Sequence, residues 1–431
     1  MRTMIHATVM FGTALAALGF SVSASAQSVA DQLFVPDLVS AVQAEALTSI
    51  TASPTTLPVI TPFWTDMVNT ENVAADGEGV YVAVLDTGLL PESPFFFRDA
   101  DIAWDLGKGF THDVTWDDSI NDIRIGPLRD DRGFVTQLAS GHGTHVASTV
   151  VGFNVNDVFW VDGVAPRATI IPVLVLDAWL IDSPYGMLGF SGGTDEMIAA
   201  GIYYIADLAP TLDRPVVINM SLGGPAPMPI IDDAIEYAIA QGVVIVVSAG
   251  NSGTEGMGYP GGNRSVISAG AGGWASMFQN GWTGNVPEKL NTPDGMGNAR
   301  QLYLEDFSSR PNKDLDQKYQ DLDVTAPGAW VVGPFKSDFA DDLNYYYLSG
   351  TSMAAPHVSG MVALLLQQYP DLGQAEVEEI LRNAAAGNPL PASDATVAFP
   401  YSDPPYYTAT WGGGDYGKGF LFADAVMKAA K

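Results

Sequence analysis

The sequence predicts an α/β fold in which a mostly parallel, twisted central sheet lies between two layers of helices. Between residues 80 and 269, short and continuously apolar segments alternate with longer helical patterns. Continuous apolar runs are typical of strands buried on both faces, and strands that alternate with helices form right-handed βαβ units. Several of these runs end in polar residues, as expected where the carboxyl ends of parallel strands form a site.

The composition bounds the class of protein. The chain has 431 residues, of which 47% are hydrophobic and 10% aromatic, and this is ample for a large core. A formal net charge of −30 argues against nucleic acid as a partner. The charge indicates either an ordinary solvated surface or adaptation to high salt. Because the chain has no cysteine, disulfide bonds and thiolate chemistry are excluded.

The first 26 residues are predicted to be a secretory signal peptide. An apolar run at 7–20, too short to span a bilayer, precedes the small-residue cleavage site Ala24-Ser25-Ala26. Residues 27–54 are interpreted as a short leader or N-terminal arm. No later stretch is long and apolar enough to cross a membrane, so we expect the mature protein to be released outside the cell or into a periplasm.

The strand candidates place several polar residues at one edge of the sheet. The predicted strands are 80–85, 168–176, 215–220, 243–247 and 265–269, and the predicted helices between them include 195–207 and 231–241. Asp86, Ser221 and Asn251 all fall at carboxyl ends of these strands, so we expect them to converge. The stretch from 91 to 137 has no such pattern and is interpreted as rich in loops.

A histidine between two glycines marks the start of another predicted helix. His142 precedes a helical pattern that begins at Thr144. The positive end of a helix disfavours imidazolium and helps to keep the ring neutral, as a general base must be. The acidic surface favours imidazolium, so we expect activity to fall below neutral pH. His145 lies three residues further on, and the two rings could instead bind a metal, although no carboxylate completes a zinc motif here.

Ser352 opens a helix that is apolar on every side. The helix continues through Met361 to Leu366, which is typical of burial on all faces. The free N–H groups and the dipole of a helix N-terminus stabilise negative charge, which suits a nucleophile that attacks a carbonyl. Taken alone, a serine at a helix start is far more often a plain N-cap than a nucleophile. Pro356 removes one helical hydrogen bond and should leave the carbonyl of Ser352 free.

Three motifs follow one another along the chain: Asp86-Thr87-Gly88, Gly141-His142-Gly143-Thr144-His145-Val146-Ala147 and Gly350-Thr351-Ser352-Met353-Ala354-Ala355-Pro356-His357. In this order, which is that of subtilisin, and with the Asn251 segment between the last two, they resemble the subtilases, the subtilisin-like serine peptidases of family S8. The resemblance covers roughly residues 55–431 and implies a single three-layer α/β/α, subtilisin-like peptidase domain.

The resemblance implies the role of each residue. Ser352 attacks a peptide carbonyl and forms an acyl-enzyme, His142 rather than His145 transfers the proton, and Asp86 orients the imidazole. The side-chain amide of Asn251 and the backbone N–H of Ser352 stabilise the oxyanion. No cofactor is required for this chemistry, and the enzyme is expected to act as a monomer on polypeptide substrates.

The resemblance also implies the substrate contacts. Ser221, Leu222 and Gly223 resemble the strand edge that pairs with an extended substrate, and Gly192 resembles the opposite rim. Gly258 resembles the floor of the first specificity pocket. Because a glycine there leaves space and adds no charge, we expect broad specificity with a preference for large apolar residues before the cut.

The chain departs from the family pattern in three places. Its leader is shorter than the folded inhibitory prodomain usual in the family, so an ordinary prodomain is expected to be missing. Residues 272–306 are interpreted as an insertion that forms a surface lobe carrying Trp274 and Trp282. The family's calcium loop is only faintly visible, at Asn154, Asn156 and Asp157; their oxygens suit a structural calcium ion, but such residues also form ordinary turns.

Two other classes of function remain open. A catalytically inactive subtilase-like binding protein is disfavoured because every reacting residue is present. An ester-cleaving α/β-hydrolase requires a Gly-x-Ser-x-Gly turn and the order serine, acid, histidine, and neither feature fits Ser352.

Overall fold

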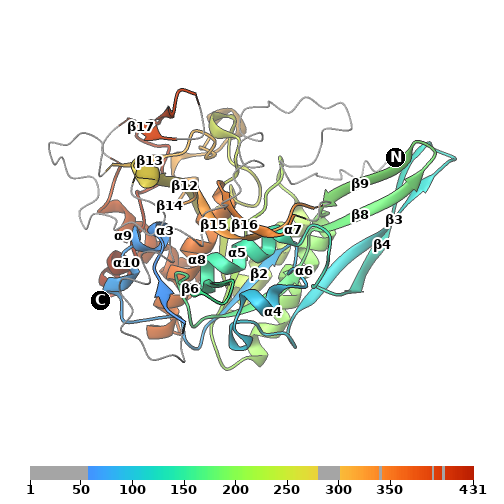
Figure 1. Ribbon diagram of the computed structural model, residues 1–431, viewed down its shortest axis with the longest axis horizontal. Coiled ribbons are helices and arrows are strands. Elements are labelled where there is room, and N and C mark those ends of the chain that lie inside the picture. The colour runs from blue at the N-terminus through green and yellow to red at the C-terminus, as the bar shows by residue number, and fades with distance from the viewer. Residues whose placement is uncertain (1–56, 280–300, 339–341, 391–392, 400–402) are drawn as a thin grey trace.

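The structure, a computed structural model, describes residues 57–279, 301–338, 342–390, 393–399 and 403–431. It confirms the α/β fold with a mostly parallel central sheet (Figure 1). The strand order is β13-β12-β11-β10-β2-β7-β3-β4, and β14 also pairs with β12. The pairs from β12 to β3 and the β12–β14 pair are parallel, whereas β13 and β4 are antiparallel to their neighbours.

The strands of the central sheet are β2 (Tyr81–Asp86), β3 (Lys108–Asp117), β4 (Asp122–Arg132), β7 (Thr169–Leu174), β10 (Val216–Met220), β11 (Val244–Ser248), β12 (Ile267–Trp274), β13 (Leu302–Leu304) and β14 (Val324–Pro327). The smaller sheets contain β1 (Val59–Ile60), β5 (Phe153–Val155), β6 (Phe159–Val161), β8 (Asp177–Ser183), β9 (Gly186–Gly192), β15 (Val331–Phe335), β16 (Asn344–Leu348), β17 (Asp394–Ala398) and β18 (Tyr406–Thr410). The helices are α3 (Phe63–Asp66), α4 (Ser93–Phe96), α5 (Gly141–Val151), α6 (Asp195–Leu208), α7 (Pro229–Ala240), α8 (Thr351–Gln368), α9 (Gln374–Ala386) and α10 (Ala423–Ala429).

The predicted strands and helices correspond to observed elements. The five strand candidates are β2, β7, β10, β11 and β12, and the two helical patterns between them are α6 and α7. Four of the observed strands begin and end within two residues of their predicted bounds. Strand β12 continues beyond its predicted end at Ala269 as far as Trp274. Each segment is buried on both faces, which is why a continuous apolar run located it.

Alternate residues of each central strand pack into different layers. In β2, Val82 and Val84 belong to the core that α5 and α8 cover, whereas Ala83 and Leu85 belong to the core beneath α6 and α7. Successive side chains of a strand point to opposite faces, so one apolar run supplies both cores. The result is the expected arrangement of helix, sheet and helix layers.

The connections around β2 create a site at its carboxyl end. After β2 the chain passes through α5 to β7 on one side of β2, and α6 then carries it to β10 on the other side. Helices α5 and α6 lie on opposite faces of the sheet. In open α/β sheets, ligands bind in the crevice outside the carboxyl ends of the strands where the strand order reverses, and Asp86 ends β2 at this point.

The interpretation of residues 91–137 as rich in loops missed a long hairpin. They contain the whole of this hairpin, β3 and β4, which with the hairpin of β8 and β9 projects from the body as an arm (Figure 1). Ion pairs such as Arg124 with Asp117 and Arg129 with Asp113 join β3 and β4. Strand β4 is mostly exposed, and β3 is buried only in its first half, so no long apolar run marked them in the sequence.

The surface-lobe interpretation of residues 272–306 also needs correction at both ends of the stretch. Gly272 to Trp274 are the last residues of β12 and pair with β13, which completes one side of the central sheet. Trp274 is buried in the core and is therefore not part of a surface lobe. Its indole fills the core because the chain returns antiparallel beside β12. Residues 280–300, with Trp282, lie outside the described residues, as do the predicted signal peptide and leader.

A buried carboxyl group follows β13. Glu305 Oε1 accepts hydrogen bonds from the hydroxyls of Tyr303, at 2.9 Å, and Tyr407, at 3.0 Å. Burial raises the pKa of Glu305 from 4.5 to about 7 because a carboxylate is poorly solvated there. The neutral acid is therefore favoured in the folded protein more than in the unfolded chain. The stabilisation that this preference supplies is complete below about pH 4.5 and is lost as the pH rises through about 7.

We predict that Glu305→Gln removes this pH dependence, because the amide keeps an oxygen that accepts both bonds and never ionises. Between pH 5 and pH 8, the free energy of unfolding of the unmodified protein should fall by about 2–3 kcal/mol through this group, and that of the variant should not. Urea titrations at the two pH values measure the difference. The exposed Glu379→Gln is the matched control and should show the same fall as the unmodified protein; identical pH profiles for Glu305→Gln and the unmodified protein would contradict the prediction.

Candidate active site

Asp86 and His142 are joined at the carboxyl edge of the sheet. Asp86 is the last residue of β2, and His142 lies in the first turn of α5. The imidazole Nδ1 is 2.8 and 3.0 Å from the two carboxylate oxygens of Asp86, and since a carboxylate only accepts, Nδ1–H is the donor. The Asp86 carboxylate is fully buried, whereas the imidazole keeps 12% of its surface exposed. This arrangement sets the tautomer in which Nε2 carries no hydrogen and can accept a proton.

Thr87 holds the two segments that carry this pair. Its backbone N–H donates to Asp86 Oδ1 at 2.7 Å, and its hydroxyl accepts the backbone N–H of Gly143 at 2.8 Å. A Cβ on Gly143 would lie 2.3 Å from the carbonyl oxygen of Gly88, so only glycine allows this approach. We did not single out Thr87 from the sequence, although its place beside Asp86 in the first motif was a signal.

His145 has a different environment. It is fully buried, its Nε2 lies 3.1 Å from the carbonyl oxygen of Val331, and burial lowers its pKa to about 3. The ring is therefore neutral and structural. In the part of the chain that the structure describes, no three or more His, Asp or Glu side chains cluster so as to hold a metal ion. The geometry thus pairs His142, and not His145, with Asp86, and it does not support a metal site formed by the two rings.

Ser352 lies at the start of α8 and is tied to Ser221. The Ser352 hydroxyl donates to the carbonyl oxygen of Ser221 at 3.2 Å, and the Ser221 hydroxyl donates to the carbonyl oxygen of Ser352 at 2.8 Å. The second bond uses the carbonyl that Pro356 was expected to leave free. Because Ser221 follows β10, and β10 pairs with β2, this bond places Ser352 at the same sheet edge as Asp86. Helix α8 also packs beside α5.

Asn251 is oriented by the residue before Ser352. Its side-chain oxygen accepts both the backbone N–H and the hydroxyl of Thr351, each at 2.9 Å. The amide nitrogen therefore faces the other way, and it lies 3.5 Å from the position that a Cβ on Gly350 would occupy. An N–H donor is thus presented at the helix N-terminus beside Ser352. Thr351 is a second positioning residue that we did not single out, although it stands between Gly350 and Ser352 in the third motif.

The segments proposed to bind substrate are only partly adjacent. Gly224 and Tyr259 exchange backbone hydrogen bonds of 2.6 and 2.7 Å, and a Cβ on Gly258 would stand 3.9 Å from the Cα of Gly223. These two segments therefore lie side by side. Ser221 and Leu222 are both buried, and the Leu222 side chain packs in the core, so only its backbone could contact a substrate.

Gly192 lies elsewhere, at the end of β9, where it pairs with Asp177. The neighbouring Ser191 hydroxyl donates to the carboxylate of Asp338. Burial raises the pKa of Asp338, while the Ser191 bond and the nearby charge of His142 oppose that shift. This rim therefore adds a second carboxyl group to the surroundings of His142.

The residues suggested for calcium form a self-contained turn between β5 and β6. The Asn154 amide donates to Asp157 Oδ1 at 2.7 Å, and its oxygen accepts the backbone N–H of Asp157 at 3.2 Å. Asn156 and Asp157 both have the left-handed backbone of a tight turn. Asn154 and Asp157 are thus bonded to each other, and the Asn156 side-chain oxygen accepts from the Tyr345 hydroxyl, so the residues present do not fit a calcium loop.

Comparison with known proteins identifies the family of this chain. The subtilase family matches residues 77–402. A subtilisin from Bacillus sp. (strain TA39) is 30% identical over 80% of this chain and 67% of its own, and subtilisin DY from Bacillus licheniformis is 34% identical over 57% of this chain and 70% of its own. Among solved structures, the S41 psychrophilic protease has a TM-score of 0.56 with 26% identity, covering 85% of this chain and 99% of its own. For sphericase the TM-score is 0.55 with 26% identity, covering 84% and 97%. The chain belongs to the subtilase family and is a serine-type endopeptidase.

Proposed function

We propose that this subtilase cleaves peptide bonds through Ser352, His142 and Asp86. The bond between His142 Nδ1 and the buried Asp86 carboxylate, at the sheet edge where Ser352 opens α8, is the observation that carries the proposal. Ser352 attacks the peptide carbonyl as His142 takes its proton, and the imidazolium then protonates the leaving amine. Water hydrolyses the acyl-enzyme by the same proton transfers in reverse order. Asp86 keeps the imidazole in the required tautomer and offsets its positive charge.

Two donors stabilise the oxyanion that forms during the attack. One is the side-chain amide of Asn251, which Thr351 orients, and the other is the backbone N–H of Ser352 at the start of α8. The first N–H groups of a helix lack intrahelical acceptors, and the helix dipole adds to their effect. These donors are in place before the reaction, so little reorganisation is needed as charge develops.

The specificity pocket accepts large apolar side chains before the cut. Its proposed floor is Gly258, beside the backbone of Gly223 and Gly224. The closest contact of a Cβ on Gly258 would be with the Gly224 carbonyl oxygen at 3.5 Å, so space remains above the backbone. Neither Gly223 nor Gly258 adds charge, and an apolar side chain would be removed from water there.

The enzyme is proposed to be secreted by means of residues 1–26. None of the helices in the described ranges is both long and apolar enough to cross a bilayer. The matched relatives include a major intracellular serine protease from Bacillus subtilis, so family membership alone leaves the compartment open. Amino-terminal sequencing of the released enzyme should give a first residue at or after Gln27; a mature chain that begins at Met1 would contradict secretion by cleavage.

Replacing Ser352 by alanine removes the nucleophile. Casein hydrolysis should fall by up to about 10⁶-fold, the loss in turnover that removal of the nucleophile causes in a subtilisin, while circular dichroism stays unchanged. Ser265→Ala, at an exposed position, is the matched control and should retain full activity. Equal activity of Ser352→Ala and the unmodified enzyme would end the proposed mechanism.

A second variant tests the oxyanion donor independently of the nucleophile. Asn251→Asp keeps an oxygen that can accept from Thr351 but loses the amide donor. Turnover should fall by about 10²–10³-fold with little change in KM, as for a subtilisin that lacks its oxyanion asparagine. Full activity of Asn251→Asp would remove this residue from the oxyanion site without affecting the role of Ser352.

A valine at Gly258 should narrow the pocket. For peptides with Phe or Leu before the cut, kcat/KM should fall by at least about tenfold, because the added methyl groups occupy the space above the backbone. For peptides with Ala at that position, kcat/KM should change little. A peptide library varied at this position measures both. Cleavage restricted to Lys or Arg in the unmodified enzyme would show that the pocket has been wrongly assigned.

A further inference from the structure

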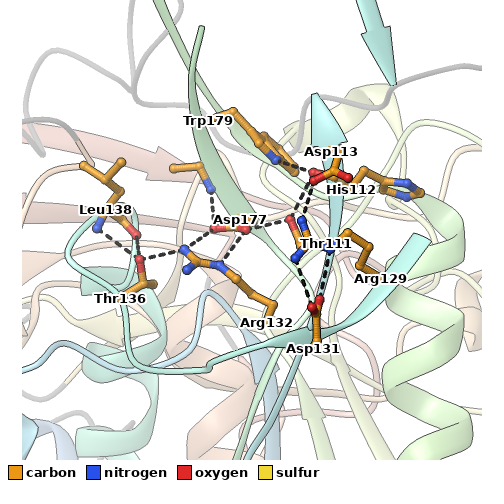
Figure 2. A network of polar contacts seen from close by, with 11 residues as sticks. Thr111, His112, Asp113, Arg129, Asp131, Arg132, Thr136, Leu138, Asp177 and Trp179 are labelled. Atoms are coloured by element: carbon orange, nitrogen blue, oxygen red, sulfur yellow. Dashed lines mark hydrogen bonds and ion pairs between the residues drawn. The ribbon is translucent and has the colours of Figure 1, made fainter. Parts of the chain in front are cut away.

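An ion pair at the base of the arm joins its two hairpins. Arg132, the last residue of β4, donates to both carboxylate oxygens of Asp177, the first residue of β8, at 3.0 and 3.1 Å (Figure 2). The same two oxygens accept the hydroxyl of Thr111 at 2.7 Å and the backbone N–H of Ala178 at 2.8 Å. A carboxylate held by an arginine fork and by two further donors has a fixed position and orientation.

On the side of Asp177, the ion pair is continuous with the segment that carries Asp86. Leu174, the last residue of β7, is the register partner of Asp86 in the pairing of β7 with β2. The backbone N–H groups of Val175 and Leu176 both donate to the carbonyl oxygen of Asp86, at 2.8 and 3.1 Å. Asp177 is the next residue along the chain. A short, hydrogen-bonded stretch of backbone therefore connects the ion pair to Asp86.

On the side of Arg132, hydrogen bonds reach the N-terminus of α5. Arg132 Nη2 donates to the hydroxyl of Thr136 at 3.0 Å (Figure 2). The carbonyl oxygen of Thr136 accepts the hydroxyl of Ser140, the residue that precedes α5. His142 is the second residue of that helix. The guanidinium that holds Asp177 is thus also attached to the start of the helix that carries the imidazole.

The ion pair therefore closes a ring of contacts around the proposed catalytic pair. One part of the ring runs from Asp86 to Asp177, and another runs from Arg132 to His142. The bond between His142 Nδ1 and the Asp86 carboxylate closes the ring at the site. Thr87 already joins the two segments next to the site, and the ion pair adds a second point of attachment. Two separate attachments restrict the orientation of α5 as well as its distance from β2.

The pair restricts geometry more than it stabilises the fold. The Asp177 side chain is only 4% exposed, and that of Arg132 is 34% exposed. Removing two charges from water offsets much of their attraction, so such a pair contributes little net stability. Its fork nevertheless fixes how the two joined groups lie relative to each other. Loss of the fork should therefore disturb the ring of contacts more than the fold.

We propose that Arg132 and Asp177 are positioning residues, which hold α5 in the orientation that keeps the imidazole of His142 against the Asp86 carboxylate. This rests on the proposed function, in which His142 transfers the proton of Ser352. Both residues act through the backbone segments that they join. A reacting group misplaced by about 1 Å can lower a rate by about 10²-fold, even when the cause lies far from the chemistry. The base of the arm is thereby part of the support of the site.

The variant Arg132→Lys tests this role because it keeps the positive charge but lacks the fork that bonds Asp177 and Thr136 together. At a temperature where circular dichroism shows the variant to be folded, kcat for a short peptide should fall by about tenfold or more, while KM stays nearly unchanged. A sulfonyl fluoride should modify Ser352 more slowly by a similar factor, since that reaction needs the same proton transfer and little substrate binding. Asp177→Asn, which removes one acceptor oxygen, should show the same division between kcat and KM.

A spectroscopic measurement reports the bond between His142 and Asp86 directly. The proton on Nδ1 gives a nuclear magnetic resonance signal in protein with labelled histidine, and its absence in His142→Ala identifies it. In Arg132→Lys this proton should exchange with water at least about tenfold faster, because a looser α5 opens the contact more often. A role confined to the stability of the arm would leave the exchange rate unchanged.

The matched control is Arg129→Lys, the same substitution in the same strand. Arg129 pairs with Asp113 and Asp131 further along the arm, and all three side chains are exposed (Figure 2). This variant should keep the kcat and the exchange rate of the unmodified enzyme. Ser140→Ala removes the bond at the other end of the route from Arg132. If both residues act through one route, the double variant Arg132→Lys, Ser140→Ala should lose little more kcat than the weaker single variant.

Three results would overturn the positioning role and leave the proposed function intact. They are an unchanged kcat in folded Arg132→Lys, an equal loss of kcat in Arg129→Lys, and an unchanged exchange rate of the Nδ1 proton. Losses that multiply in the double variant would contradict the single route from Arg132 to His142. Undiminished peptide hydrolysis by Ser352→Ala would instead refute the proposed function itself.

Discussion

The contact between the first turn of α5 and the turn after β2 is the constraint on which the rest of the site depends. Asp86 is buried at the end of a central strand, where an isolated carboxylate would be costly, and the His142 imidazole supplies it with a partner. The two backbones approach closely only because Gly143 has no side chain facing Gly88. Any displacement of α5 would therefore separate the imidazole from the carboxylate.

A second set of contacts brings α8 to the same edge. Pro356 frees a carbonyl in the first turn of that helix, and the hydroxyl of Ser221 occupies it. Thr351 in turn holds the side-chain oxygen of Asn251, which leaves the amide nitrogen available as a donor at the start of the helix. A helix interruption and two short polar side chains thus link three distant parts of the chain. Their hydrogen bonds satisfy buried polar groups that would otherwise destabilise the fold.

The arm shows where inference from the sequence was weakest. Its strands are stabilised by ion pairs, ring contacts and cross-strand bonds instead of burial on both faces, so they carry no continuous apolar run. Hairpins of this kind depend on which residues face each other, and that register is not visible in the sequence. Trp274 was wrongly assigned to a surface lobe for the opposite reason. Its glycine-rich and asparagine-rich surroundings resemble a loop, yet antiparallel pairing with β13 buries it.

The sequence by itself determined the fold class, the central strands and the residues of the proposed site. Continuous apolar runs arise from burial on both faces, and the motifs around Asp86, His142 and Ser352 are local in the chain. Only the tertiary structure decided which histidine meets Asp86, that Thr87 and Thr351 act as supports, and that Arg132 and Asp177 join the hairpins. These are contacts between residues far apart in sequence, and their geometry depends on the packing of whole elements rather than on any local pattern.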